Sequence, residues 1–81
     1  MTQHIQDQLT EVFQSVFDDD AMVLTPELHA AQVPGWDSLT HVRLMLSVER
    51  KFRVKFTVTE IGELKNVGEL ASLIERKLRR A

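Results

Sequence analysis

Asp37, Ser38 and His41 bring an acid, a hydroxyl and an imidazole close together, which are the three groups of a hydrolytic triad. All three would lie within about one turn of a single helix, and no neighbouring segment would form an oxyanion hole or a substrate pocket. The other histidines, His4 and His29, lie in separate segments without the spacing of metal ligands. These residues therefore predict neither a nucleophilic enzyme nor a metal centre.

The first half of the chain predicts one helix and a long loop. Apolar residues recur at helical spacing over residues 3–17, and Thr2 is a suitable N-cap for that helix. The connection over residues 18–37 is long for a compact domain, which is typical of a functional loop. Within it we expect a short helical turn over Pro26–Ala30 and a type II turn at Pro34-Gly35.

A second helix is expected over Ser38–Phe52, because Asp37 is a good N-cap and the segment contains no Gly or Pro. Residues 52–58 alternate between apolar and polar side chains, as a strand would. No second strand pattern is available to pair with them, and an isolated strand leaves its backbone groups unpaired. We therefore expect an extended loop that buries Val54 and Phe56.

Two capping motifs predict the remaining helices. Thr57-Val-Thr-Glu60 is a capping box that opens a short helix ending at about Leu64. Asn66-Val-Gly-Glu69 has the same arrangement and opens the last helix. The apolar stripe of that helix is expected to contain Val67, Leu70, Ala71, Ile74 and Leu78.

Length and composition indicate one small domain over residues 1–81. The chain has 81 residues, and 43% of them are apolar, which suffices for one small core. It contains no cysteine, which excludes a disulfide scaffold and a catalytic thiol. The N-terminus does not resemble a secretory signal, and no apolar run approaches the roughly 20 residues of a membrane span, so we expect a cytoplasmic protein. Charge is unevenly distributed, with −7 before Ser38 and +5 from Ser38 onward.

The segment Gly35-Trp36-Asp37-Ser38-Leu39, at the start of an amphipathic helix, resembles the attachment motif of the acyl carrier protein family. The resemblance covers nearly the whole chain, because the helices and the long loop follow in the family's order and spacing. It implies an all-α, acyl-carrier-like four-helix bundle with three longer helices, one short third helix and a long first loop. It also implies that Ser38 carries a covalent 4′-phosphopantetheine arm derived from coenzyme A, with Asp37 and Leu39 beside it.

The resemblance further implies a role and partners. A phosphopantetheinyl transferase would install the arm with magnesium, and a ligase or synthase would load an acyl or aminoacyl group as a thioester for downstream acyl-processing enzymes. The protein would be a non-catalytic, monomeric, free-standing carrier in fatty-acid-like, polyketide or other specialised biosynthesis. The missing cysteine fits this role, because the thiol would arrive on the arm. A helix start is also a suitable site for the negative charge of a phosphodiester.

A helical wheel separates two apolar faces of the second helix. The expected core face contains Leu44, Met45, Val48, Phe52 and a partly buried His41. A second strip, adjoining Ser38, consists of Leu39, Val42 and Leu46. It is flanked by the charged residues Glu49, Arg43 and Arg50. Apolar side chains ringed by charges are typical of a docking surface, and the alternative is a single wide core face.

The charge of this helix departs from the family resemblance. Well-known fatty-acid carriers have a strongly acidic second helix, whereas here Arg43, Arg50 and Lys51 stand against Asp37 and Glu49. Charge patterning mainly sets partner choice and encounter rate. We therefore expect a specialised carrier whose enzymes present less basic, or acidic, docking faces.

Two other functions are compatible with the residues alone. One is a small basic helical module that binds nucleic acid with steep salt dependence through Arg43, Arg50, Lys51, Arg53 and Lys55. The other is a protein-docking module in which Ser38 could be replaced by Ala without consequence. Both predict that no covalent modification takes place, which distinguishes them from a carrier.

Overall fold

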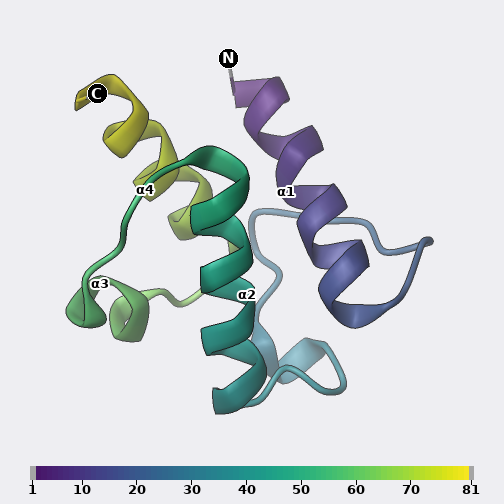
Figure 1. The fold of residues 1–81 in the computed structure, drawn as a ribbon. Coiled ribbons are helices and arrows are strands. Elements are labelled where there is room, and N and C mark those ends of the chain that lie inside the picture. The colour runs from purple at the N-terminus through teal and green to yellow at the C-terminus, as the bar shows by residue number, and fades with distance from the viewer. Residues whose placement is uncertain (1, 81) are drawn as a thin grey trace.

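The chain folds into helices joined by one long connection (Figure 1). The structure is a computed structural model that describes residues 2–80, and the side chains of residues 4–79. The helices are α1 (Thr2–Phe17), the 3-10 helix η1 (Ala30–Gln32), α2 (Ser38–Phe52), α3 (Val58–Glu63) and α4 (Val67–Arg80). Within residues 2–80 there is no strand. The expected all-α bundle, with three longer helices and a short third one, is confirmed.

α1 begins at Thr2, one residue earlier than expected, and the side chain of Thr2 lies outside the described part of the structure. The helix ends at Phe17, because Asp18 adopts a left-handed conformation with φ 51°. The backbone N–H of Asp19 then donates to the carbonyl of Gln14 at 3.0 Å. This turn satisfies a carbonyl of the last helical turn and directs the chain into the long loop.

The long loop differs from the prediction at one point. The chain does turn at residues 26–27, where the Leu28 N–H donates to the Thr25 carbonyl at 3.1 Å, but the expected helical turn does not continue to Ala30, and the short helix of the loop is instead η1. Continuing a helix there would require the Pro26 and Leu28 carbonyls to accept hydrogen bonds from residues further along the loop. Both carbonyls instead accept from the start of α4, where Gly68 donates to Pro26 and Val67 donates to Leu28, each at 2.9 Å. The loop thus caps α4.

The core lies where α1 packs against α2 and α4 (Figure 1). Its buried apolar side chains are Ile5, Leu9, Val12, Phe13, Leu24, Leu44, Met45, Val48, Phe52, Val54, Val67, Leu70 and Ile74. The predicted core face of α2 is confirmed, with His41 half-buried at its edge.

The predicted core stripe of α4 needs one correction. Leu78 is 38% exposed, whereas Leu73, which was not expected in the core, is 5% exposed. Leu78 lies in the last turn of α4, and Figure 1 shows that this turn stands away from α2. Helical spacing alone does not show which turns of a helix extend beyond the neighbouring helices.

Residues 54–57 form the extended loop that we expected in place of a strand. Val54 is buried, and Phe56 packs against the core. The side chain of Glu49 explains how this segment is held, because its carboxylate accepts the backbone N–H of Phe56 at 2.7 Å. The loop therefore pairs its backbone with a side chain of α2 rather than with another strand.

The capping box at Thr57 is present, and at Asn66 the side-chain cap is present while Glu69 Oε1 accepts from the Lys65 N–H at 2.9 Å instead of from Asn66. Thr57 Oγ1 accepts from the Glu60 N–H at 3.1 Å, and Glu60 Oε1 accepts from the Thr57 N–H at 2.8 Å. At the start of α4, Asn66 Oδ1 accepts from the Glu69 N–H at 2.8 Å. These bonds satisfy backbone donors that the helices leave unpaired, so α3 and α4 begin where the sequence predicts.

Two leucines of α2 provide a matched test of this packing. Leu44 is fully buried and Leu46 is 52% exposed. Leu44→Ala should lower the free energy of unfolding by about 2–5 kcal/mol, because it leaves a cavity in the core. Leu46→Ala should change it by about 0.5 kcal/mol or less. Urea unfolding followed by circular dichroism measures both values, and equal losses would contradict the assignment of the two faces.

Candidate functional site

Ser38 is the first residue of α2 and is exposed. Asp37 precedes it in an extended conformation, and the Asp37 Oδ1 accepts the backbone N–H of Thr40 at 2.9 Å. The expected N-cap is therefore confirmed. Figure 1 shows this beginning of α2 at the end of the molecule opposite the start of α1 and the end of α4.

The turn that leads into α2 has the predicted type II geometry. Gly35 has φ 88°, the left-handed conformation that the third position of such a turn requires. The backbone N–H of Trp36 closes the turn by donating to the Val33 carbonyl at 3.2 Å. Gly35 thus delivers the chain to Asp37 in the orientation that the cap needs.

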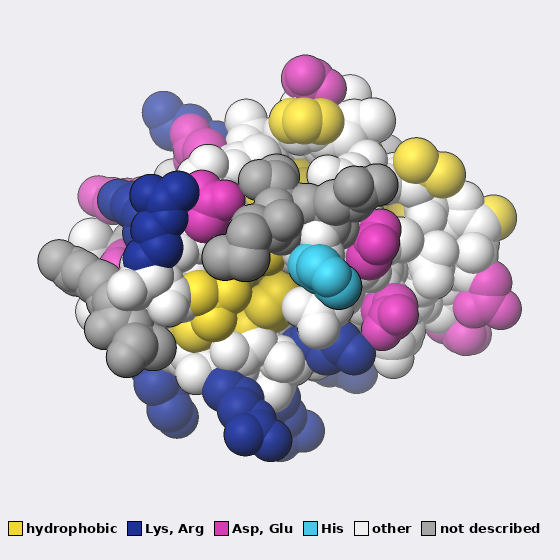
Figure 2. All heavy atoms as spheres, turned by 90° about the horizontal axis from the view of Figure 1, so that it is seen from above, with side chains coloured by type: hydrophobic (Ala, Val, Ile, Leu, Met, Phe, Trp, Pro, Cys, Tyr) yellow, Lys and Arg dark blue, Asp and Glu magenta, His cyan; other side chains and the backbone are white. Residues whose placement is uncertain are grey.

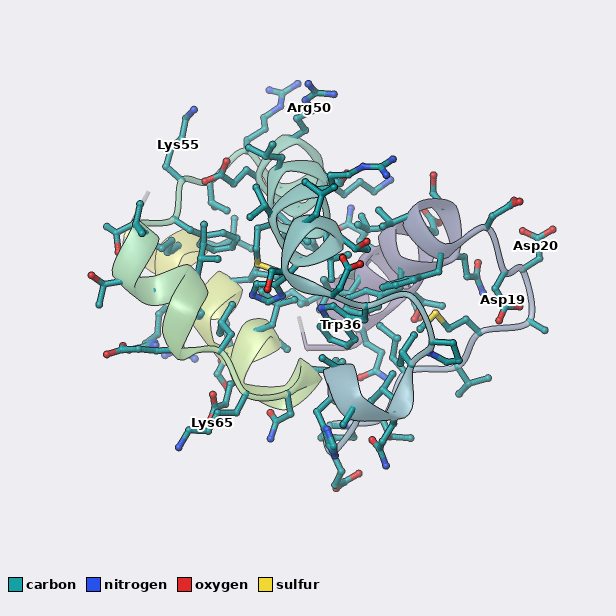
Figure 3. All side chains as sticks on the ribbon, turned by 90° about the horizontal axis from the view of Figure 1, so that it is seen from below. Asp19, Asp20, Trp36, Arg50, Lys55 and Lys65 are labelled. Atoms are coloured by element: carbon teal, nitrogen blue, oxygen red, sulfur yellow. The ribbon has the colours of Figure 1, made fainter. Side chains whose placement is uncertain are left out.

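Trp36 anchors this turn to three helices. Its ring meets Phe13 of α1 edge to face, with centroids 5.4 Å apart, and lies 5.9 Å from the ring of Phe17. Its indole N–H donates to Nδ1 of His41 in α2 at 3.0 Å, and Nε2 of His41 lies 3.1 Å from the carbonyl of Ile61 in α3. Figure 3 shows Trp36 near the centre of this end of the molecule. Through these contacts Trp36 packs the end of the long loop onto the bundle.

These contacts also determine the proton position on His41. Because Nδ1 accepts from the indole, the proton of a neutral ring must reside on Nε2, which then donates to the Ile61 carbonyl. Both ring nitrogens are thereby used in holding the fold. His41 is not available as a base for Ser38, which agrees with the prediction that no hydrolytic triad is formed.

A hollow of about 510 Å³ opens beside Ser38. Its wall is mainly apolar and includes Trp36, Val42, Met45, Ile61 and Leu64. A group attached to Ser38 could therefore extend into solvent or lie along this wall. The sequence did not predict this hollow, because its two sides come from α2 and from the region of α3.

The strip next to Ser38 is a surface and not part of a wide core face. The exposed fractions are 71% for Leu39, 48% for Val42 and 52% for Leu46. Three such side chains in a row on one helix form an apolar patch that water covers in the isolated chain. We call these three residues the apolar strip.

The flanking charges are not equivalent. Arg43 and Arg50 are exposed, as expected. Glu49 is half-buried, and its carboxylate is already bonded to the Phe56 N–H, so it contributes less free negative charge to the surface than the sequence suggested. No local sequence pattern predicts the bond between Glu49 and Phe56, because Phe56 comes close to Glu49 only after the chain has turned back at Arg53.

Comparison with known proteins agrees with this geometry. Residues 7–74 match the family model of the phosphopantetheine attachment site. The acyl carrier protein of Helicobacter pylori strain 26695 is 36% identical over 56 residues, which cover 69% of this chain and 72% of that protein. The protein of strain J99 is 34% identical over the same shares of both chains.

A solved structure extends the similarity to the fold. The solution NMR structure of holo acyl carrier protein from Geobacter metallireducens matches with a TM-score of 0.86 and 48% identity. The match covers 93% of this chain and 86% of that one. Fold and site together define a small helical carrier of a phosphopantetheine group. The chain belongs to the acyl carrier protein family, whose cofactor is covalently bound 4′-phosphopantetheine.

The described residues fit this cofactor. An exposed hydroxyl on the first turn of a helix is accessible to a modifying enzyme, and the helix start favours the charge of a phosphodiester. The hollow beside it offers an apolar wall to whatever the arm carries. None of the helices described over residues 2–80 combines the length and apolar character that a membrane span requires.

The cap at Asp37 should make part of the stability depend on pH. The N–H of Thr40 donating to Asp37 lowers the pKa of that carboxyl below its ordinary value. The stabilisation that the ionised Asp37 carboxyl gives the folded state is therefore complete above about pH 4. It is lost as the pH falls through the lower pKa that this carboxyl has in the folded state. Asp37→Asn keeps a capping side chain that cannot titrate.

Between about pH 5 and about pH 3, the wild type should lose more unfolding free energy than Asp37→Asn does, as measured by urea titration at each pH. The pKa of Glu60 is also lowered, chiefly by its bond with Lys77, but Glu60 titrates in both proteins and cancels in the comparison. Identical pH profiles would show that Asp37 does not cap α2 through its ionised form.

The bond between Trp36 and His41 should contribute measurably to stability. We expect a double-mutant cycle of Trp36→Phe, His41→Leu and the double variant to give a coupling energy of about 1 kcal/mol, because the two side chains share one hydrogen bond. Urea unfolding of the four proteins measures it. Additive single-variant losses would mean that the indole and imidazole act independently.

Proposed function

We propose that the Ser38 hydroxyl is the attachment point of the phosphopantetheine arm. The observation that carries the proposal is the exposure of Ser38 at the first position of α2, within residues 7–74, which match the attachment family. Ser38 Oγ would bond to the pantetheine-side phosphorus of coenzyme A, and the pyrophosphate bond of coenzyme A would break. The products are the modified chain and 3′,5′-ADP, and a base of the transferase takes the serine proton.

Asp37 and Leu39 complete the proposed attachment site in different ways. Asp37 holds the start of α2 through its bond to Thr40, so it keeps Ser38 at the surface. Leu39 is the most exposed member of the apolar strip and adjoins Ser38, so it offers an apolar contact to the transferase. Neither residue takes part in a reaction, and the protein acts as a non-catalytic carrier.

The apolar strip is the proposed docking surface for the transferase, the loading ligase or synthase, and the enzymes that later process the acyl group. Val42 and Leu46 supply the centre of this surface, and Arg43, Arg50 and the edge of Glu49 border it. An apolar centre with a charged border is the usual composition of a transient interface. The carrier is expected to be a single monomeric domain in the cytoplasm.

The cargo is proposed to be an acyl or aminoacyl thioester in a fatty-acid-like, polyketide or other specialised pathway. The apolar wall of the hollow beside Ser38 supports an acyl group, because burying apolar surface against it would remove that surface from water. A tether at Ser38 would also raise the effective concentration of the cargo at each docked enzyme. Carrying and presenting the cargo is then the whole task of the chain.

Modification at Ser38 can be tested by intact mass. Co-expression with a broad-specificity phosphopantetheinyl transferase should add one 4′-phosphopantetheine to the wild type and none to Ser38→Ala. Ser72→Ala, which removes another exposed serine hydroxyl, should be modified like the wild type. An unmodified wild type, or a modified Ser38→Ala, would refute the attachment site.

A further inference from the structure

The outward face of α2 alternates apolar and basic side chains. Leu39, Arg43, Leu46 and Arg50 follow one another at intervals of four, three and four residues, which places them in one line along the helix. All four are exposed. The line begins at Leu39, beside Ser38, and ends about 16.5 Å further along the helix axis, at Arg50.

The cations on this face have no anionic partner within the described part of the chain. The side chains of Arg43, Arg50, Arg53 and Lys55 form no hydrogen bond or ion pair there, whereas the Lys51 side chain is paired with Glu11 at 2.9 Å. The two acids of this region are engaged with backbone N–H groups, Asp37 with Thr40 and Glu49 with Phe56. The face therefore presents unpaired positive charge.

Three of these cations meet at a second hollow, beyond the C-terminal end of the apolar strip. It has a volume of about 480 Å³ and is lined by Leu46, Glu49, Arg50, Arg53, Val54 and Lys55. Figure 3 shows Arg50 and Lys55 pointing outward at one edge of the molecule, with Asp19 and Asp20 at a different edge. In Figure 2, Lys and Arg side chains gather along the lower edge and Asp and Glu side chains lie at the right, whereas both kinds occur at the left.

We propose that α2 docks a protein partner whose contact surface is apolar at its centre and carries carboxylates around it. The partner's apolar side chains would cover Leu39, Val42 and Leu46, and a carboxylate would occupy the hollow between Arg50, Arg53 and Lys55. This arrangement rests on the proposed function, because docking along α2 brings the partner's reaction centre to the Ser38 end of the helix. Arginine suits the contact, since its planar guanidinium can hold a carboxylate through two hydrogen bonds.

A protein fits this surface better than a nucleic acid does. The arginines are interleaved with exposed leucines and a valine. A sugar-phosphate backbone lying there would press charged phosphates against these apolar side chains, and desolvating a charge without a partner costs free energy. The chain as a whole is negative, with a formal charge of −2, so long-range attraction for a polyanion is weak. A carboxylate-bearing apolar surface satisfies both kinds of side chain.

Two synthetic helical peptides with identical leucine positions, one with Glu and one with Lys at the polar positions, test the proposal. Titrated into the 15N-labelled Ser38→Ala chain, the Glu peptide should bind about tenfold more tightly than the Lys peptide, a difference of about 1.4 kcal/mol. Amide shifts should change along α2 and at Lys55. Using Ser38→Ala separates docking from attachment, so a failure of docking leaves the mass test of Ser38 unaffected, and the reverse also holds.

Charge-reversal variants define which cations act. Arg43→Glu/Arg50→Glu should reverse the peptide preference, and Lys55→Glu alone should weaken binding of the Glu peptide. The matched control is Lys65→Glu, an exposed cation that Figure 3 shows on another side of the molecule; it should leave the affinity unchanged within about twofold. Amide spectra confirm that each variant is folded.

Three results would overturn the proposal. Equal affinity for the two peptides would show that charge does not select the partner. If Lys65→Glu weakened binding of the Glu peptide as much as Lys55→Glu does, only the net charge of the chain would matter. Tighter binding of a short DNA duplex than of the Glu peptide would assign the face to nucleic acid.

Discussion

The position of the Ser38 hydroxyl depends on the half-buried Trp36 side chain, whose ring packs against the core while its indole N–H is hydrogen-bonded. Within the bundle, Nδ1 of His41 accepts that proton, and the ring contacts Phe13 and Phe17. Nε2 of the same histidine lies 3.1 Å from the Ile61 carbonyl, so Trp36 and His41 together tie the end of the long loop to α1, α2 and α3. Moving the half-buried ring would break this hydrogen bond, so the ring has few alternative positions. The loop is therefore anchored two residues before the hydroxyl.

The two ends of α2 serve different purposes within one rigid element. At its beginning, Asp37 and the turn at Gly35 hold the proposed attachment site at the surface. Toward its end, Glu49 holds the loop that carries Phe56, which leaves the nearby arginines without an internal partner. The buried face of the same helix anchors both ends to the core. A carrier that must meet several enzymes gains from this division, because docking and presentation then share a fixed geometry.

Interactions between close neighbours in the chain could be predicted from the residues, and those between distant segments could not. The bounds of α2, the cap at Asp37 and the box at Thr57 and Glu60 follow from contacts within four residues. The helical turn expected over Pro26–Ala30 forms only at residues 26–27, because the carbonyls of Pro26 and Leu28 bind the start of α4. Leu78 was wrongly placed in the core, since helical spacing does not say where neighbouring helices end.

The sequence by itself determined that a serine would stand at the start of an amphipathic helix with an apolar strip beside it. Capping and turn preferences act locally, so the order of the residues is enough to place them. Only the tertiary structure decided that His41 is committed to Trp36 and Ile61, that Glu49 binds the Phe56 N–H, and that a hollow opens beside Ser38. Each of these depends on groups from separate segments meeting in space, and the free energy that selects them comes from burial and hydrogen-bond satisfaction in the packed bundle.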